Sequence, residues 1–226
     1  AMHVLNVLVY SYIGEQWESG RRYLIENDIY INVENEDAWN IYIFKNICNA
    51  LFLLVKKENW NDLAEACKLI ADLRKEQSNF ELNYINSVDA SNKMLATYEL
   101  ISLYHLAKIV DLTASFMTSG EITDIREQMG MHFEKAIEAA EEGGIVSLDL
   151  MLIMLQKMLN KMISNSVWMV TQKVNSRVTK FVRSITKQDK AVFELMYPQK
   201  RAILDEGLLD PAHKAIVVNM PTSSGK

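Results

Sequence analysis

Residues that interrupt helices are scarce in this chain. Three prolines and eight glycines are few for 226 residues, and such a composition favours helices over strands joined by many turns. Apolar residues make up 49% of the chain and recur at helical spacing through most of its length. A chain of this size and composition can bury one large core or two smaller ones. We therefore expect an all-α fold.

Apolar periodicity and capping residues locate the expected helices. Asn59 can cap the start of one helix, and the Ser119-Gly120 and Gly143-Gly144 pairs mark the ends of two others. Successive helices arranged in this way predict an antiparallel helical array. The expected helices cover residues 3–27, 38–55, 59–77, 89–118, 123–142 and a long stretch that begins at 147.

The spacing of these helices resembles that of a helical repeat. Hairpin-like pairs recur about every 35 residues, close to the tetratricopeptide period of ~34 residues. The pattern Trp60-x-x-Leu63-Ala64-x-x-Cys67 is similar to the start of that repeat, but no second copy follows at the right offset. The sequence therefore predicts an array that has tetratricopeptide-like hairpins as one alternative.

The helix that begins near Ser147 is apolar on nearly every side, which predicts a central place in the bundle. It also carries a stripe of methionines at helical spacing. Methionine fills irregular gaps well, so the stripe suits either core packing or an adaptable partner groove, and we favour core packing. The stripe consists of Met151, Met154, Met158 and Met162.

Charge divides the chain into two parts. Residues 1–170 hold 14 Lys and Arg against 24 Asp and Glu, whereas residues 171–226 hold 10 against 5. The first part is thus acidic and the second is basic. This division predicts different binding partners for the two parts.

A basic amphipathic helix is expected between Val170 and Lys190. Its cationic residues fall on one face, and Val174, Val178, Phe181, Val182 and Ile185 fall on the other. Lys and Arg at this spacing can follow a phosphate backbone, which makes DNA or RNA a physically sensible partner. The alternatives are a solvated face or a face that pairs with the acidic array. The cationic residues are Lys173, Arg177, Lys180, Arg183, Lys187 and Lys190.

The sequence ends on a short apolar strand, residues 216–219, followed by Pro221-Thr222-Ser223-Ser224-Gly225-Lys226. This ending resembles motif I, the phosphate-binding loop, of superfamily 2 (DEAD/DEAH-type) helicases and translocases. Met220 and Ser223 depart from the usual form of that motif. Upstream, Tyr197-Pro198-Gln199 opens a segment similar to the glutamine-containing helix that precedes motif I in many of these motors.

The resemblance covers residues 193–226 and implies an ATP site. In that family the glutamine reads the adenine edge, which points to Gln199, and the loop binds the phosphates with its backbone and its lysine. Magnesium is held in the family by a Ser or Thr at the position after the lysine, which would follow Lys226. ATP and Mg²⁺ are therefore expected cofactors of a longer parent protein, and the fragment is expected to be inactive and to bind neither. The implied nucleotide-binding residues are Gln199, Thr222, Ser223, Ser224, Gly225 and Lys226.

Three regions follow from these patterns. We expect a helical accessory domain over residues 2–170, a basic connecting helix over 171–192 and the start of a helicase ATPase domain over 193–226. The helical domain is then an accessory module that docks on the motor, binds a protein partner or guides nucleic acid. One alternative is the helical-repeat interaction module of a signalling P-loop ATPase that does not act on nucleic acid. Another is a scaffolding helical protein with a chance Gly-Lys ending.

Other side-chain chemistry is sparse in the sequence. Cys48 and Cys67 have no Cys-x-x-Cys spacing, so free thiols in a reducing cytosol are expected. No transmembrane span or secretory signal is visible, and we expect a cytoplasmic protein without membrane contact. Ala1 is interpreted as a cloning remnant. The four histidines lack partners at metal-site spacing, and four glutamates form an acidic helical edge that is expected to be solvated. They are His3, His105, His132 and His213, and Glu134, Glu138, Glu141 and Glu142.

Overall fold

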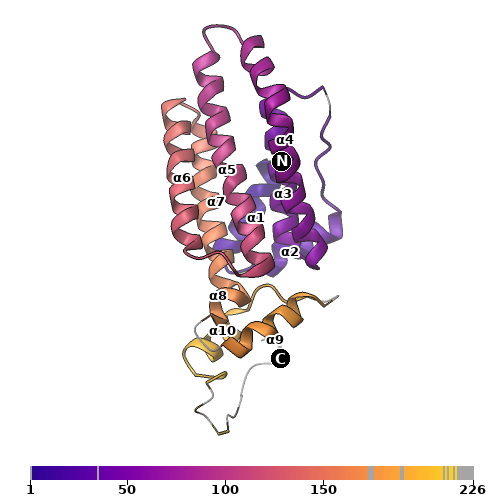
Figure 1. The fold of residues 1–226 in the computed structure, drawn as a ribbon, viewed down its shortest axis with the longest axis vertical. Coiled ribbons are helices and arrows are strands. Elements are labelled where there is room, and N and C mark those ends of the chain that lie inside the picture. Colours follow the sequence, from indigo (N-terminus) through magenta and orange to yellow (C-terminus); the bar gives the residue numbers. More distant parts are fainter. Residues whose placement is uncertain are drawn as a thin grey trace.

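The computed structural model describes residues 2–34, 36–172, 176–188, 191–210, 212, 214, 215 and 217. These residues form ten helices (Figure 1). The helices are α1 (Met2–Ile13), α2 (Trp17–Asn27), α3 (Trp39–Lys56), α4 (Trp60–Ser87), α5 (Lys93–Ser119), α6 (Ile125–Glu142), α7 (Val146–Asn165), α8 (Val167–Thr171), α9 (Ser176–Thr186) and α10 (Tyr197–Leu204).

Helices α3 to α7 form an antiparallel array in which each helix packs against the next (Figure 1). Helix α3 also packs against α5, and α1 packs against α7. Helices α8, α9 and α10 lie together at one end of the array, below it in Figure 1. The prediction of an all-α antiparallel array is therefore confirmed, while the tetratricopeptide-like detail stays a prediction.

The predicted helix boundaries at capping residues are confirmed. The side-chain oxygen of Asn59 accepts a hydrogen bond of 2.8 Å from the backbone N–H of Asn61 at the start of α4. Gly120 ends α5 in the left-handed conformation, with φ at 67°. Helix α6 ends at Glu142, immediately before the Gly143-Gly144 pair.

The expected single helix over residues 3–27 is wrong, because the chain turns between α1 and α2. Glu15 has a φ of 58°, in the left-handed region, and the N–H of Gln16 donates back to the carbonyl of Ser11 at 2.7 Å. Glu15 also pairs with Lys161 of α7. The turn brings Glu15 and the start of α2 beside the C-terminal half of α7.

Other expected boundaries also differ from the structure. Helix α5 begins at Lys93, four residues after its expected start at residue 89. Helix α4 continues ten residues beyond Gln77, to Ser87, since no proline or glycine interrupts it and Tyr84 packs against the core. The basic helix expected from Val170 to Lys190 is shorter in the described residues, where α9 spans Ser176–Thr186. The short strand expected over residues 216–219 falls on residues of which the structure describes Val217 alone, without regular structure.

The core joins all parts of the array. Helix α7 packs against α1, α5, α6 and α8, in agreement with its expected position, although Leu150 on one side is 56% exposed. Met151, Met158 and Met162 are buried and Met154 packs against the core, which confirms the core role of the methionine stripe. Methionine is thus used as a packing residue at this position.

Within the described part of the chain, one helix, α5, has the length and apolar composition of a membrane span. More than half of its most apolar window is buried by the rest of the chain. Its neighbours on either side are α4 and α6, and α3 lies against it as well. Its apolar composition is thus used in packing against other helices.

Candidate functional site

The predicted phosphate-loop residues Thr222, Ser223, Ser224, Gly225 and Lys226 lie outside the described residues. The remaining member of the predicted nucleotide site, Gln199, lies within them. It occupies the first turn of α10, the helix expected from its resemblance to the glutamine-containing helix.

Gln199 caps its own helix. Its side-chain oxygen accepts a hydrogen bond of 2.9 Å from the backbone N–H of Met196, and Pro198 occupies the first turn, where its missing N–H is not needed. The bond fixes the orientation of the amide, since it identifies the oxygen as the acceptor. The sequence order Tyr197-Pro198-Gln199 thus produces a rigid helix start.

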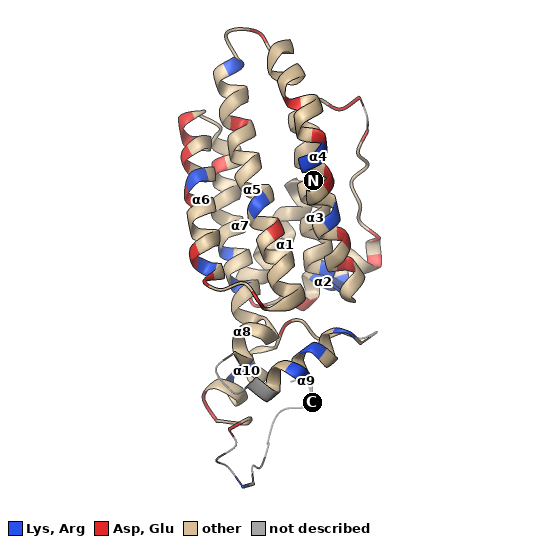
Figure 2. Cartoon of the chain, viewed as in Figure 1, with Lys and Arg blue, Asp and Glu red and all other residues tan. Residues whose placement is uncertain are grey.

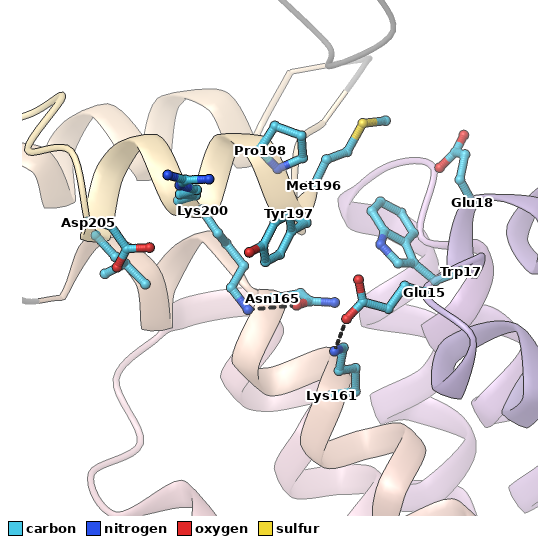
Figure 3. A pocket seen from close by; sticks show the side chains of 12 residues that line it. Glu15, Trp17, Glu18, Lys161, Asn165, Met196, Tyr197, Pro198, Lys200 and Asp205 are labelled. Atoms are coloured by element: carbon cyan, nitrogen blue, oxygen red, sulfur yellow. Dashed lines mark hydrogen bonds and ion pairs between the residues drawn. The ribbon is translucent and has the colours of Figure 1, made fainter. Parts of the chain in front are cut away.

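A cleft of about 370 Å³ separates α10 from the helical array (Figure 3). Lys200 crosses it and donates to the side-chain oxygen of Asn165 at 3.0 Å, and Lys161 pairs with Glu15 at 2.5 Å. Burial, together with the nearby charge of Lys161, lowers the pKa of Lys200 below its ordinary value. The cleft is lined by side chains of both signs and by Trp17 and Tyr197. Its charges are therefore largely matched within the protein.

Three buried polar residues join the array to the segment that precedes α10. The hydroxyl of Tyr12 in α1 donates to Oε2 of Glu194 at 2.7 Å, and the ammonium of Lys57 contacts the same oxygen at 2.5 Å and the Tyr12 hydroxyl at 3.0 Å. Lys57 is 3% exposed and Glu194 is 6% exposed. We call Tyr12, Lys57 and Glu194 the buried cluster.

The electrostatics of the buried cluster follow from its isolation from water. Burial lowers the pKa of Lys57, although the Glu194 carboxylate opposes that shift. Burial and the same carboxylate raise the pKa of Tyr12 well above its ordinary value. Oε1 of Glu194 has no hydrogen-bond partner among the described residues. Loss of the contact from either Tyr12 or Lys57 would therefore leave the buried Glu194 carboxylate with a single side-chain partner among the described residues.

Backbone hydrogen bonds reinforce this junction. The N–H of Val167 donates to the carbonyl of Phe193 at 2.9 Å, and the N–H of Leu195 donates to the carbonyl of Asn165 at 2.8 Å. Ser166 and Glu194 form an antiparallel β-bridge between these bonds. Gln199, Lys57 and Glu194 also line a common cavity of about 220 Å³. The helix that carries Gln199 is therefore firmly attached to the array.

Sequence reasoning missed the buried cluster. Lys57 stands between Lys56 and Glu58, where a solvated helix end is the ordinary interpretation, and Glu194 lies 137 residues away. Lys57 has a φ of 20° at the end of α3, and this backbone turn aims its side chain inward. The positive φ of Lys57 marks this inward turn in the structure, but a backbone angle cannot be read from the sequence.

The predicted basic face is described in part. Figure 2 shows Lys and Arg residues along α9. Lys180 and Lys187 are exposed and make no ion pair among the described residues, whereas Arg183 pairs with Glu121 of the α5–α6 connection at 2.5 Å. Lys173 and Lys190 lie outside the described residues, as does the side chain of Arg177.

Among the described residues, the apolar side of α9 differs from the prediction at one position, while Val174 lies outside the described residues. Val182 is buried and Val178 and Ile185 pack against the core, but Phe181 is 60% exposed beside the basic face. Phe181 lies at the edge of the apolar arc of α9. An exposed aromatic ring therefore lies beside the basic face.

Two of the four histidines that appear isolated in the sequence meet in the structure. The Nδ1 atoms of His105 in α5 and His132 in α6 are 2.9 Å apart. Burial lowers the pKa of both below the ordinary value, with Lys108 and Lys135 adding to the effect. No group of three or more metal-ligating side chains occurs within the described part of the chain.

The remaining predictions from single residues agree with the structure. Cys48 and Cys67 are free, and burial raises the pKa of Cys48 to about 12, so this thiol is unreactive. The acidic edge of α6 is exposed at all four glutamates, Glu134, Glu138, Glu141 and Glu142.

Comparison of the chain with protein-family models, with curated proteins and with solved structures found no match.

Proposed function

We propose that this chain is the N-terminal accessory and interaction domain of an ATP-dependent nucleic-acid helicase or translocase of superfamily 2. The observation that carries the proposal is the order of three elements in the sequence. A helix opening with Tyr197-Pro198-Gln199 precedes the apolar run Ile216-Val217-Val218, and this run precedes the loop that ends at Lys226. Each element alone is common, but together they resemble the start of such a motor.

The position of α10 supports this proposal. Gln199 is oriented by its cap, and α10 is attached to the array by the Lys200–Asn165 hydrogen bond and the two backbone bonds beside Glu194. An adenine-reading glutamine must be held in place, because its amide distinguishes a base by donating and accepting at fixed positions. The array would then serve as a rigid support for the first part of the ATP site.

The cofactors of the proposed parent protein are ATP and Mg²⁺. Gln199 would hold the adenine edge, and Lys226 would contact the outer phosphates. Bound ATP would supply the energy for movement on DNA or RNA. The helical domain would contribute recognition, either of the nucleic acid through α9 or of a protein partner through the array.

ATP hydrolysis tests the proposed identity. A parent protein that continues past Lys226 through a downstream acidic motif is expected to hydrolyse ATP and to be stimulated by nucleic acid. Lys226→Ala in that protein should lower turnover by about 100-fold or more, because it removes a charge that stabilises the transition state. Residues 1–226 alone should show no phosphate release above a buffer control. Turnover by the fragment, or full activity of Lys226→Ala, would contradict the proposal.

Nucleic-acid binding tests the role of α9. Lys180→Glu together with Lys187→Glu is expected to weaken binding of the chain to a labelled single-stranded or double-stranded oligonucleotide at least tenfold. If each lysine contacts one phosphate, the slope of log affinity against log salt should decrease in magnitude by about 1.8 on duplex DNA and by about 1.4 on a single strand. Electrophoretic mobility or fluorescence anisotropy at several salt concentrations measures both quantities, with DNA and RNA compared directly.

A matched control separates contact from overall charge. Lys135→Glu with Lys157→Glu changes two exposed lysines of α6 and α7, and hence changes the net charge equally. This control should keep the salt slope of the wild type, and its affinity should decrease only by the small amount that long-range charge explains. Equal weakening in both double variants would show that α9 makes no specific contact.

A further inference from the structure

An open groove lined by aromatic residues lies on the array, far in sequence from the proposed ATP site. It has a volume of about 740 Å³ and is formed by the N-terminal end of α3 and the C-terminal half of α4. We call Trp39, Tyr42, Phe80 and Tyr84, which line it, the aromatic groove. The ring of Trp39 stacks on Tyr42 at 5.5 Å and on Phe80 at 5.7 Å between centroids.

Trp39, which lines the aromatic groove, has a buried hydrogen-bond donor without an acceptor among the described residues. Trp39 is 6% exposed, and its indole Nε1 has no partner among the described residues. A buried indole N–H ordinarily finds an acceptor, because leaving it unpaired is unfavourable. On the other side of the ring stack, Phe80 is 50% exposed and offers an open aromatic surface.

The charge around the groove favours a cationic ligand. Asp37 lines the groove but is already paired with Lys45 at 2.7 Å, whereas Glu76 lines it without an ion pair or hydrogen bond in the described part of the chain. The segment 28–37, which leads into α3, has four acidic residues and no Lys or Arg. Figure 2 shows acidic residues on this segment, and Ile31 within it is hydrogen-bonded to Asn49 of α3.

We infer that the aromatic groove binds a basic peptide segment of a partner protein, with an arginine side chain on the aromatic rings and beside Glu76. A guanidinium group stacks on aromatic faces and pairs with a carboxylate at the same time. A basic peptide can extend from Glu76 towards the acidic residues of segment 28–37, which a small free cation cannot contact at the same time. The inference stands independently of the proposed ATPase, because no residue of the groove belongs to residues 193–226.

Direct binding of a defined peptide tests this inference. The probe is a fluorescein-labelled (Arg-Ser-Gly)₃ peptide, compared with the same peptide in which citrulline replaces arginine. Citrulline keeps the shape of arginine and removes its charge. Anisotropy titration of the complete chain is expected to show saturable binding of the arginine peptide and at least tenfold weaker binding of the citrulline peptide.

Variants locate the binding site. Glu76→Gln changes a partly exposed side chain and should weaken the arginine peptide at least fivefold without altering the fold. Phe80→Leu removes the half-exposed ring of the groove and should weaken the arginine peptide. Glu138→Gln, on the acidic edge of α6, removes the same charge elsewhere and should leave affinity unchanged.

Three results would overturn the inference. They are equal affinity for the two peptides, equal weakening by Glu76→Gln and Glu138→Gln, and absence of saturable binding at millimolar peptide. Sedimentation velocity of the wild type and of Glu76→Gln tests whether the groove binds a second copy of this chain in place of a peptide. If the groove instead holds a second copy of this chain, the wild type will dimerise and Glu76→Gln will shift that equilibrium.

Discussion

Lys57→Met is expected to lower the free energy of unfolding by about 3–5 kcal/mol, because it leaves the buried Glu194 carboxylate without its cationic partner. Methionine matches the length and apolar stem of lysine, so the change removes charge with little change in volume. Like lysine, methionine carries a Cβ, and the strain at the positive φ of position 57 is therefore retained. Urea denaturation followed by circular dichroism measures the loss.

The neighbouring lysine provides the matched control. Lys56 is partly exposed and pairs with Glu58 at 3.6 Å, so Lys56→Met should change stability by less than about 0.5 kcal/mol. The double variant Lys57→Met with Glu194→Gln removes both charges and should recover much of the loss, since a neutral pair has a smaller desolvation penalty. A full loss in the double variant would show that packing, and not the buried charge, determines the effect.

The same variants test the link between the array and the proposed ATP site. Glu194 lies five residues before Gln199, and both line the cavity of about 220 Å³ with Lys57. Weakening the buried cluster should therefore loosen α10 before it unfolds the array. Hydrogen exchange should increase first in residues 191–204 of Lys57→Met, whereas α3 to α6 should keep their protection.

The sequence was most informative where local chemistry decides the structure. Asn59 and Gly120 set helix ends through capping and left-handed geometry, and both effects depend on a few consecutive residues. The apolar periodicity likewise predicted the all-α array. Gln199 was located on a helix for the same reason, because Tyr197 and Pro198 next to it define a helix start.

Contacts between distant segments were not predictable in this way. Lys57 and Glu194 meet only because α3 ends beside the segment before α10, and His105 meets His132 only because α5 and α6 are antiparallel. The position of Trp39 in a groove could not be predicted for the same reason, since the groove is formed in part by the ten residues by which α4 exceeds its expected length. Such features require the packing of helices to be known first.

Gly120→Ala is expected to destabilise the protein by about 2–5 kcal/mol, through two separate effects. Gly120 has a φ of 67°, where an alanine is strained by ~1–2 kcal/mol. A Cβ at this position would also lie 2.5 Å from Cδ2 and 2.6 Å from Cε3 of Trp168, and such overpacking adds ~1–3 kcal/mol. Trp168 is held in place, because its indole N–H donates to the carbonyl of Met117 at 2.9 Å.

Gly144→Ala separates the two effects, because Gly144 has the same φ of 67° and a Cβ there meets no atom within 4 Å. It should therefore show the backbone strain alone, and the difference between the two variants in urea denaturation measures the clash with Trp168. Equal losses would show that Trp168 moves aside freely. A larger loss in Gly120→Ala would identify Trp168 as a rigid contact between the end of α5 and α8. Helix α8 directly follows Asn165 and Ser166, which bind the segment before α10, so this contact would also support the attachment of α10.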